Sequence, residues 1–296
     1  GDSHARRHAE DPFKSLGGIP AGVGADERAG DFSLVGGDAR ASRDGDWSES
    51  YIVKLVDWHL KEQETMTWLT GTAYWPFKDF STPLRPENPV PYVNQKGVIE
   101  RDFAKKEVFY VFQSYWTQKP MIHIYGHTWP TRWGAANEPK EILVYSNCPA
   151  VELFVNGVSQ GIKQRNSQDF PAAGLHWKCV LREGENQLKA VAVKSKEAIS
   201  DEITVAYQTA QWGEPKQLKL TSYPEGENII RVEAQLTDDK GIPCLDAANL
   251  ISFEAAGDGE LIQNLGTSTG SRKVQAYNGK AMIRVKVCLL YTSDAA

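Results

Sequence analysis

The sequence of 296 residues has neither the long apolar segments of a membrane-spanning helix nor an excess of positive charge. Its apolar runs all fall short of the roughly 18 residues that cross a bilayer. Lysine and arginine number 33 against 38 aspartates and glutamates, which gives a formal net charge of -5. Without a basic stripe to neutralise phosphates, the chain lacks the charge pattern of proteins that bind nucleic acids or anionic membranes.

Cysteine is also scarce. The 4 cysteines, Cys148, Cys179, Cys244 and Cys288, are widely spaced and form no Cys-x-x-Cys pair. Their spacing predicts neither a disulfide framework nor a metal site, and we expect three buried free thiols and a fourth in an irregular tail. Residues 288–296 abandon the preceding strand pattern and are predicted to be a non-native tail. The chain starts at Gly1 without a methionine, so we expect it to be truncated.

The common catalytic motifs are absent too: there is no Gly-x-Ser-x-Gly, Walker loop, dinucleotide-binding glycine motif after a strand or His-Glu-x-x-His. His123 and His127 lie four residues apart in a predicted strand. At about 3.3 Å per residue they would be about 13 Å apart, too far to bind one metal ion. We therefore predict no metal site and no cofactor.

Aromatic residues, in contrast, are abundant, with 9 Trp, 11 Tyr and 10 Phe. Sugar rings stack on aromatic faces, so this composition fits a carbohydrate-handling protein. It fits an ordinary β-rich core equally well, and composition alone leaves both interpretations open.

The first part of the chain alternates helices and an apolar run with long loops. A glycine-rich stretch at 14–46 precedes a predicted helix at 46–64. Residues 68–75 are predicted to form a strand buried on both faces, followed by a proline-rich loop and a helix at 103–115. This order is typical of a β/α unit, so residues 1–117 are predicted to be the last part of a larger β/α domain.

From Lys119 onward, apolar and polar residues alternate with period two, which indicates half-buried strands. Asn156-Gly157 between apolar flanks predicts a two-residue hairpin turn. We predict two immunoglobulin-like β-sandwiches, at 118–209 and 214–287, with a linker between them. The predicted strands are 121–125, 141–146, 151–155, 175–181, 187–193, 202–207, 217–222, 229–236, 250–254, 273–277 and 281–287.

Three places are candidates for a functional site. Asp2 and His4 open the glycine-rich stretch, where polar residues either line a site or simply face solvent. Trp75 follows the predicted buried strand at the end where β/α barrels bind ligands, and its indole is either a floor for a sugar ring or an aromatic packed under the loop. Asn94 and Lys96 either hold hydroxyls or a carboxylate, or belong to a turn that ends in glycine.

Several segments, taken together, resemble glycoside hydrolase family 2. They are GTAYWPFKDF at 71–80, YVNQKGV at 92–98, Arg101-Asp102, YVFQSYW at 110–116, KPMIHIY at 119–125 and VYSNCPAVELFVNG at 144–157. The family contains retaining β-galactosidases, β-glucuronidases and β-mannosidases. The resemblance implies that 1–117 is the C-terminal part of a (β/α)8 TIM barrel, followed by the two sandwiches.

The resemblance also implies a double displacement that uses two glutamates, one as nucleophile and one as general acid/base. Residues 1–4 resemble the sequence just after the family's nucleophile, so both glutamates are expected upstream of Gly1 and the chain alone is expected to be inactive. Trp75 matches the family's sugar-platform tryptophan, and Asn94 matches an asparagine of the sugar subsite. Lys96 completes the Asn-x-Lys-Gly pattern with which β-glucuronidases hold the uronate carboxylate.

Because β-galactosidase-like members with this sandwich also carry Asn-x-Lys-Gly, the pattern does not decide the sugar. We expect a β-galactosidase-like parent enzyme, with a β-glucuronidase-like one as the first alternative. A non-enzymatic carbohydrate-binding or structural β-sandwich protein is the competing class. The expected partner is a β-glycoside or an oligo- or polysaccharide, without nucleic acid or a membrane span, and a periplasmic or secreted bacterial location is favoured.

Overall fold

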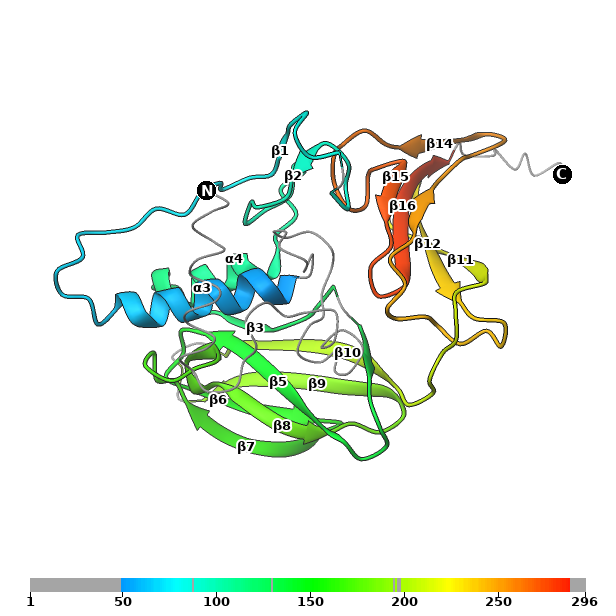
Figure 1. The fold of residues 1–296 in the computed structure, drawn as a ribbon. Helices are drawn as coiled ribbons and strands as arrows, with labels where there is room; N and C mark the ends of the chain where they lie inside the picture. Colours follow the sequence, from blue (N-terminus) through cyan, green and yellow to red (C-terminus); the bar gives the residue numbers. More distant parts are fainter. Residues whose placement is uncertain (1–48, 87, 129, 194, 196–197, 288–296) are drawn as a thin grey trace, which may run out of the picture. The chain divides into compact units, whose positions relative to one another are not determined.

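The computed structural model describes residues 49–287 except 87, 129, 194 and 196–197 (Figure 1). These residues form two compact units, which we describe separately. The first comprises 49–78, Lys96–Ile99 and Ala104–Ala210, and the second Asp79–Gln95, Glu100–Phe103 and the chain from Gln211 onward. The predictions for Asp2, His4, the glycine-rich stretch at 14–46 and the tail at 288–296 lie outside the described residues. Within the described part, no helix is long and apolar enough to cross a membrane.

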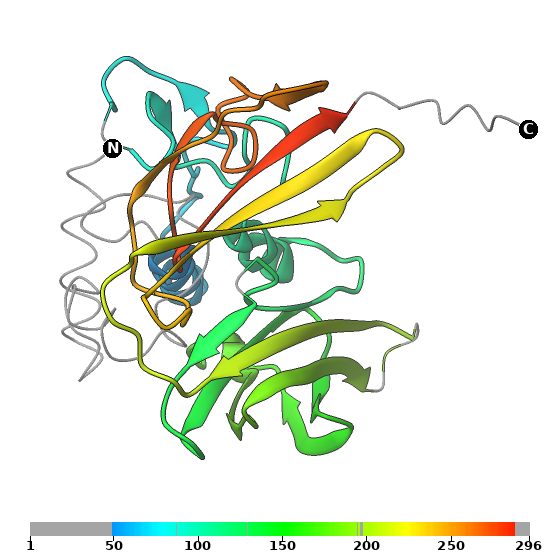
Figure 2. The same ribbon diagram turned by 90° about the vertical axis from the view of Figure 1, so that its right-hand side faces the viewer.

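The first unit contains two helices that pack side by side, α3 (Glu49–Gln63) and α4 (Glu107–Trp116) (Figures 1 and 2). The helix predicted at 46–64 is confirmed as α3, which buries an apolar face that includes Ile52, Val56 and Leu60. Helix α4 begins four residues later than the predicted start at 103. Phe103 has a φ of 71°, a left-handed conformation that cannot continue into a helix.

The first unit also contains two sheets packed face to face, as predicted for a β-sandwich. One is five-stranded in the order β4-β10-β9-β6-β7, and the other is three-stranded in the order β3-β5-β8. Residues from both sheets, such as Val144, Leu153 and Val205, share one buried core. The elements are β3 (Ile122–Ile124), β4 (Thr131–Trp133), β5 (Pro139–Ser146), β6 (Ala150–Val155), β7 (Val158–Gln164), η1 (Ala172–Gly174), β8 (His176–Val180), β9 (Gly184–Val193) and β10 (Ser200–Gln208).

The predicted hairpin turn is confirmed between β6 and β7. Asn156 has a φ of 51° and Gly157 a φ of 81°, the pair of positive values that a type I′ turn requires. The prediction for the cysteines is confirmed where it falls on described residues, because Cys148, Cys179 and Cys244 are free and buried. Strand β4 was not predicted, since its three residues are too few to show a period.

The second unit holds a four-stranded antiparallel sheet in the order β11-β12-β16-β14. A separate pair, β13 with β15, contributes Ile251 and Val274 to the same core as Ala234 and Ile283 of the larger sheet. A hairpin of β1 and β2 belongs to this unit and adds Val93 to the core. The elements are β1 (Phe80–Ser81), β2 (Val93–Asn94), β11 (Gln217–Pro224), β12 (Ile229–Thr237), β13 (Leu250–Ser252), β14 (Gly259–Ile262), β15 (Lys273–Gln275) and β16 (Lys280–Val287).

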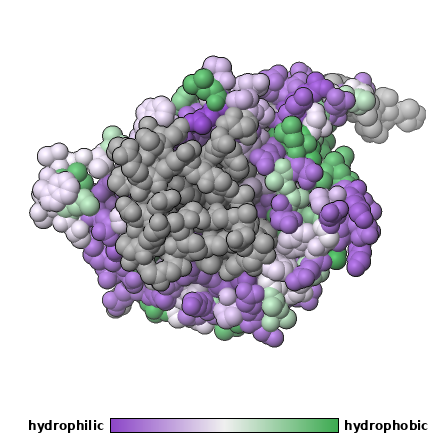
Figure 3. Space-filling view, viewed as in Figure 1, coloured by the Kyte–Doolittle hydropathy of each residue, from purple (hydrophilic) through white to green (hydrophobic). Residues whose placement is uncertain are grey.

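Strand β11 is an edge strand, and all of its residues are exposed. Leu218 and Leu220, two residues apart, lie on one face of the strand with 48% and 61% of their surface exposed. Hydrophobic residues are visible over this sheet in Figure 3. One edge of the second unit therefore presents both apolar side chains and open backbone groups to solvent.

The prediction of a strand at 68–75 is wrong for this structure. The segment forms turns and an irregular extended stretch, with Trp68 at 75% and Trp75 at 62% exposure. A strand buried on both faces needs hydrogen-bonded neighbours and a cover on each side, and no described strand pairs with these residues. The barrel assignment for 1–117 and the predicted domain boundaries stay predictions.

Helix α3 contacts the sandwich of its unit through a buried carboxylate. Asp57 Oδ2 accepts hydrogen bonds from the backbone N–H of Ala172 at 2.7 Å and from the hydroxyl of Tyr145 at 3.3 Å. Asp57 Oδ1 has no hydrogen-bond partner among the described residues. Burial raises the pKa of Asp57 from 3.8 to about 6, against the lowering effect of these hydrogen bonds and of Arg165.

This raised pKa predicts a pH-dependent stability. The folded chain retains the Asp57 proton up to about pH 6, whereas the unfolded chain releases it near pH 3.8. Asp57 therefore stabilises the folded state most at low pH, and this contribution is lost as pH rises through 6. Urea unfolding at about pH 5 and about pH 7.5 should show a loss of roughly 1 kcal/mol that Asp57→Asn removes. The exposed Asp258→Asn should keep the wild-type dependence; an unchanged slope in Asp57→Asn would contradict the assignment.

Candidate functional site

The predicted site residues fall in both units. Trp75 and Lys96 belong to the first unit, and Asn94 belongs to the second. Trp75 is 62% exposed. Its two interpretations, a floor for a sugar ring and an aromatic packed under the loop, both stay predictions.

Lys96 starts a short segment that is fixed by backbone hydrogen bonds within the first unit. The backbone N–H of Val98 donates to Phe77 O at 3.0 Å, and the backbone N–H of Lys106 donates to Val98 O at 3.1 Å. The side chain of Lys96 is half-buried. Partial burial lowers the pKa of the Lys96 ammonium from its usual 10.5.

Tyr74 connects Trp75 with Lys96. Its hydroxyl donates to the carbonyl oxygen of Lys96 at 2.8 Å, and its ring packs against Phe112 of α4 with centroids 5.3 Å apart. Tyr74 precedes Trp75 in the chain, so the backbone of Lys96 is hydrogen-bonded to the neighbour of Trp75.

Asn94 is held in the second unit by the hairpin of β1 and β2. It pairs with Phe80 across the hairpin and is only 8% exposed. The neighbouring Gln95 is also buried, and its Oε1 accepts a hydrogen bond from the backbone N–H of Val90 at 3.1 Å. Asn94 is therefore buried, and its backbone is held in the hairpin.

A groove of about 990 Å³ lies within the second unit, beside this hairpin. Tyr92, 58% exposed and with a φ of 61°, lines it together with Arg101 and Lys273. Neither Arg101 nor Lys273 forms an ion pair with a described residue, whereas Arg272 in the same lining contacts Glu254 at 2.8 Å. The groove thus combines an exposed aromatic ring with two positive charges that are not paired with any acidic side chain of the described residues, a combination suited to acidic sugars. No local sequence pattern predicts this groove, because its lining comes from segments far apart in the chain.

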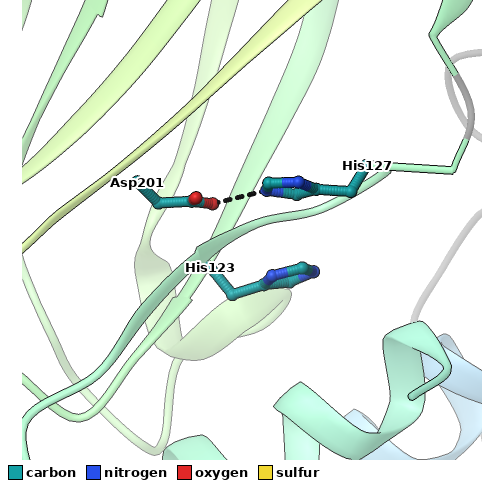
Figure 4. A group of neighbouring side chains, drawn as sticks. All are labelled: His123, His127 and Asp201. Carbon is teal, nitrogen blue, oxygen red and sulfur yellow. Dashed lines mark hydrogen bonds and ion pairs between the residues drawn. The ribbon is translucent and has the colours of Figure 1, made fainter. Parts of the chain in front are cut away.

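A second group of side chains gathers in the first unit, where His123 and His127 lie beside Asp201 (Figure 4). The two imidazole rings stack with centroids 4.7 Å apart and an angle of 17° between their planes. The expected separation of about 13 Å is wrong, because strand β3 ends at Ile124 and Gly126, with a φ of 99°, turns the chain back. Gly126, which lies between the two histidines, was the feature of the sequence that could have indicated this turn.

Hydrogen bonds hold this group in place. His127 Nε2 lies 2.7 Å from Asp201 Oδ2, and the backbone N–H of Ile124 donates to the same oxygen at 2.7 Å. Burial by itself would raise the pKa of Asp201, but these hydrogen bonds lower it below 3.8. Burial would likewise lower the pKa of His127, but the contact with Asp201 raises it above 6.5.

Comparison with known proteins relates the chain to glycosidases. Residues 137–200 match a domain of unknown function, DUF4982. The chain is 43% identical over 97% of its length to a putative β-glucuronidase of Formosa agariphila, of which it covers 34%. It is 28% identical over 64% of its length to the β-galactosidase BoGH2A of Bacteroides ovatus, of which it covers 22%. A crystal structure of a β-glucuronidase from Parabacteroides merdae superposes with a TM-score of 0.80 at 68% identity, over 83% of this chain and 31% of that one.

The chain belongs to glycoside hydrolase family 2. The family resemblance seen in the sequence is thereby confirmed, and the chain spans about a third of the length of the two β-glucuronidases, 34% and 31%. Among these family 2 relatives, the two that are named β-glucuronidases are more similar to the chain than the β-galactosidase is. The expectation that placed galactose before glucuronic acid is therefore supported less well than its alternative.

Proposed function

We propose that this chain is part of a β-glucuronidase-like exo-glycosidase, in which Lys96 binds the carboxylate of a terminal glucuronic acid. The observation that carries the proposal is the half-buried Lys96 in the Asn-x-Lys-Gly pattern at 94–97, whose backbone carbonyl is held by the hydroxyl of Tyr74. The relatives of 43% and 68% identity, both named β-glucuronidases, support the same sugar.

The charge of Lys96 is the reason for preferring an acidic sugar. An ammonium that has lost part of its hydration gains most from a partner of opposite charge. Glucuronic acid offers a carboxylate at C6, whereas galactose offers only a neutral hydroxyl there. Charge-assisted hydrogen bonds contribute about 1.5–3 kcal/mol, which is enough to discriminate the two sugars.

Trp75 is proposed to bind the same sugar, with its exposed indole stacked on the C–H face of the ring. For Asn94 the proposal is based on the sequence resemblance alone, which matches it to an asparagine of the sugar subsite whose amide would hydrogen-bond a hydroxyl. These residues bind and orient the substrate, whereas the two glutamates that the family mechanism requires are expected upstream of Gly1. In this proposal the chain supplies specificity and its parent enzyme supplies bond cleavage.

The proposal predicts a substrate-specific effect of Lys96 in the full-length enzyme. Lys96→Ala should lower kcat/KM for a β-glucuronide by roughly 10- to 100-fold, because one charge-assisted hydrogen bond is lost. Activity on the matched β-galactoside should change much less. The exposed Lys119→Ala serves as a control and should leave both activities unchanged. An equal loss on both substrates would show that Lys96 does not read the carboxylate.

The lowered pKa of Lys96 adds a second readout. The ammonium carries its charge below its pKa and loses it as pH rises, at a lower pH than an exposed lysine would. The kcat/KM for the glucuronide should therefore fall on the alkaline side, while Lys96→Arg, which stays charged, should shift this fall to higher pH. A pH profile with the same alkaline limb in both proteins would argue against Lys96 as the group that titrates.

The chain of residues 1–296 should show no turnover of β-glucuronides or β-galactosides when purified alone. The reason is the expected position of both catalytic glutamates upstream of Gly1. A fluorogenic substrate of each kind measures this directly, with the full-length enzyme as positive control. Steady hydrolysis that copurifies with the chain would place the catalytic carboxylates within it.

We propose as a second candidate function that the groove of the second unit binds an acidic glycan. Tyr92 offers a stacking surface there, and Arg101 and Lys273 offer charge without a described ion-pair partner. The side chain of Arg101 lies so close to Gly266 that a Cβ at 266 would come within 2.6 Å of Arg101 Nη1. This packing holds the guanidinium at the groove.

Calorimetry of the chain with an oligogalacturonate and with a neutral cello-oligosaccharide tests this second candidate. We expect binding of the acidic oligosaccharide only, weakened at least 10-fold by Arg101→Ala combined with Lys273→Ala, since two charged contacts are lost. The exposed Lys240→Ala in the same unit is the matched control. Equal affinity for the neutral oligosaccharide, or an equal loss in the control, would overturn it.

A further inference from the structure

We propose that His123, His127 and Asp201 form a binding site for one divalent transition-metal ion such as Zn²⁺. The site lies in the first unit and is separate from the residues proposed to bind the sugar. It reverses the expectation from the sequence that the chain has no metal site. That expectation depended on a continuous strand through both histidines, and the chain turns between them.

The donor atoms are already close together. One ligand atom from each residue lies within 4.8 Å of those of the other two. Around Zn²⁺, with bonds of about 2.0–2.2 Å, ligand atoms lie roughly 3.3 Å from one another, so the donor atoms would have to approach by up to about 1.5 Å. The two imidazole rings would also have to rotate out of their stack, because a nitrogen lone pair lies in the plane of its ring and both must point at one ion. Figure 4 shows Asp201 facing His127, with the ring of His123 stacked beside that of His127.

His123 is prepared as a ligand by the residue on its other nitrogen. Its Nε2 lies 2.7 Å from Oε2 of Glu107, and both side chains are buried. A carboxylate at this distance accepts the Nε2 proton, which leaves the lone pair of Nδ1 for an ion. Carboxylate–histidine–metal arrangements of this kind orient the ring and strengthen its donor nitrogen.

Further contacts fix these groups. The backbone N–H of Glu107 donates to the carboxylate of Glu49, and the ring of Tyr110 stacks on His123 with centroids 3.6 Å apart. The backbone N–H of Ile124 holds Oδ2 of Asp201 independently of His127. The site therefore keeps two of its three ligands positioned by residues that do not themselves bind the ion.

The chemistry of the donors selects the ion. Two imidazole nitrogens and one carboxylate oxygen suit Zn²⁺, Co²⁺, Ni²⁺ or Cu²⁺, whereas Mg²⁺ and Ca²⁺ prefer sites made of oxygen ligands. The side chain of His127 is 37% exposed, so an ion can reach the site from solvent and water can complete its coordination. On binding, the ion takes the place of the proton shared by His127 and Asp201, and that proton passes to solvent.

Such an ion would cross-link distant parts of the first unit. His123 lies in β3, His127 follows it, and Asp201 lies in β10, so the ion joins the two sheets of the sandwich. Because the ligands are brought together only in the folded chain, binding stabilises the fold by mass action. The proposed role is therefore structural and independent of glycoside hydrolysis.

Metal titration of the purified chain tests the proposal without any activity assay. After treatment with a chelator, equilibrium dialysis against Zn²⁺ should give one ion per chain, and saturating Zn²⁺ should raise Tm. His127→Ala and Asp201→Asn should each abolish stoichiometric binding. Co²⁺ in place of Zn²⁺ should give the visible absorption of a site with nitrogen and oxygen ligands, and Mg²⁺ should give no effect.

Two further variants separate a built site from a general effect of histidine. Glu107→Gln should weaken Zn²⁺ binding roughly 10- to 100-fold, the range for loss of an outer hydrogen-bond partner. His176→Ala removes a histidine of the same unit that contacts Glu141 at 3.0 Å and should leave binding unchanged. Circular dichroism establishes that each variant is folded. Failure of the folded wild-type chain to bind Zn²⁺ stoichiometrically, or equal binding by Asp201→Asn, would leave His127 and Asp201 as an ordinary ion pair and overturn the proposal.

Discussion

The first unit depends on how helix α4 is anchored, and the anchor is polar. Glu107 opens the helix in a buried position, where its backbone binds Glu49 of α3 and its carboxylate binds His123 of β3. One residue earlier, the backbone N–H of Lys106 holds the segment of Lys96. Buried charged groups stabilise a fold only when their partners are placed accurately, so this anchor specifies position more than it adds strength.

The same helix contacts both regions of the first unit for which a function is proposed. Its N-terminal turn holds His123, and Phe112 of its second half supports Tyr74, whose hydroxyl binds the backbone of Lys96. A displacement of α4 would therefore move both the proposed sugar ligand and the proposed metal ligand. The hydrogen bond between Asp57 and the backbone of Ala172 likewise holds α3 against the sandwich, and α3 packs beside α4.

The sequence predicted the features that depend on neighbouring residues, namely most strands and one turn. Period-two alternation located most strands of both units, and Asn156-Gly157 identified a turn that needs two positive φ values. Residues 68–75 were mistaken for a buried strand because an apolar run shows propensity but not whether a neighbouring strand is there to pair with it. Of the site, the sequence identified Trp75, Asn94 and Lys96 as candidates, although their substrate contacts stay predictions. The groove and the histidine cluster depend on contacts between distant residues, and only the fold reveals them.

The open edge of strand β11 bears on how the chain behaves when it is produced by itself. An edge strand carries a row of backbone donors and acceptors that can pair with another strand. The exposed Leu218 and Leu220 add apolar surface that would favour such pairing. Lys219 between them is the kind of charged residue that opposes such pairing. Lys219 thus opposes association of one chain with a second copy through this edge, and because salt weakens the repulsion between lysines on facing strands, such association would be favoured at high ionic strength.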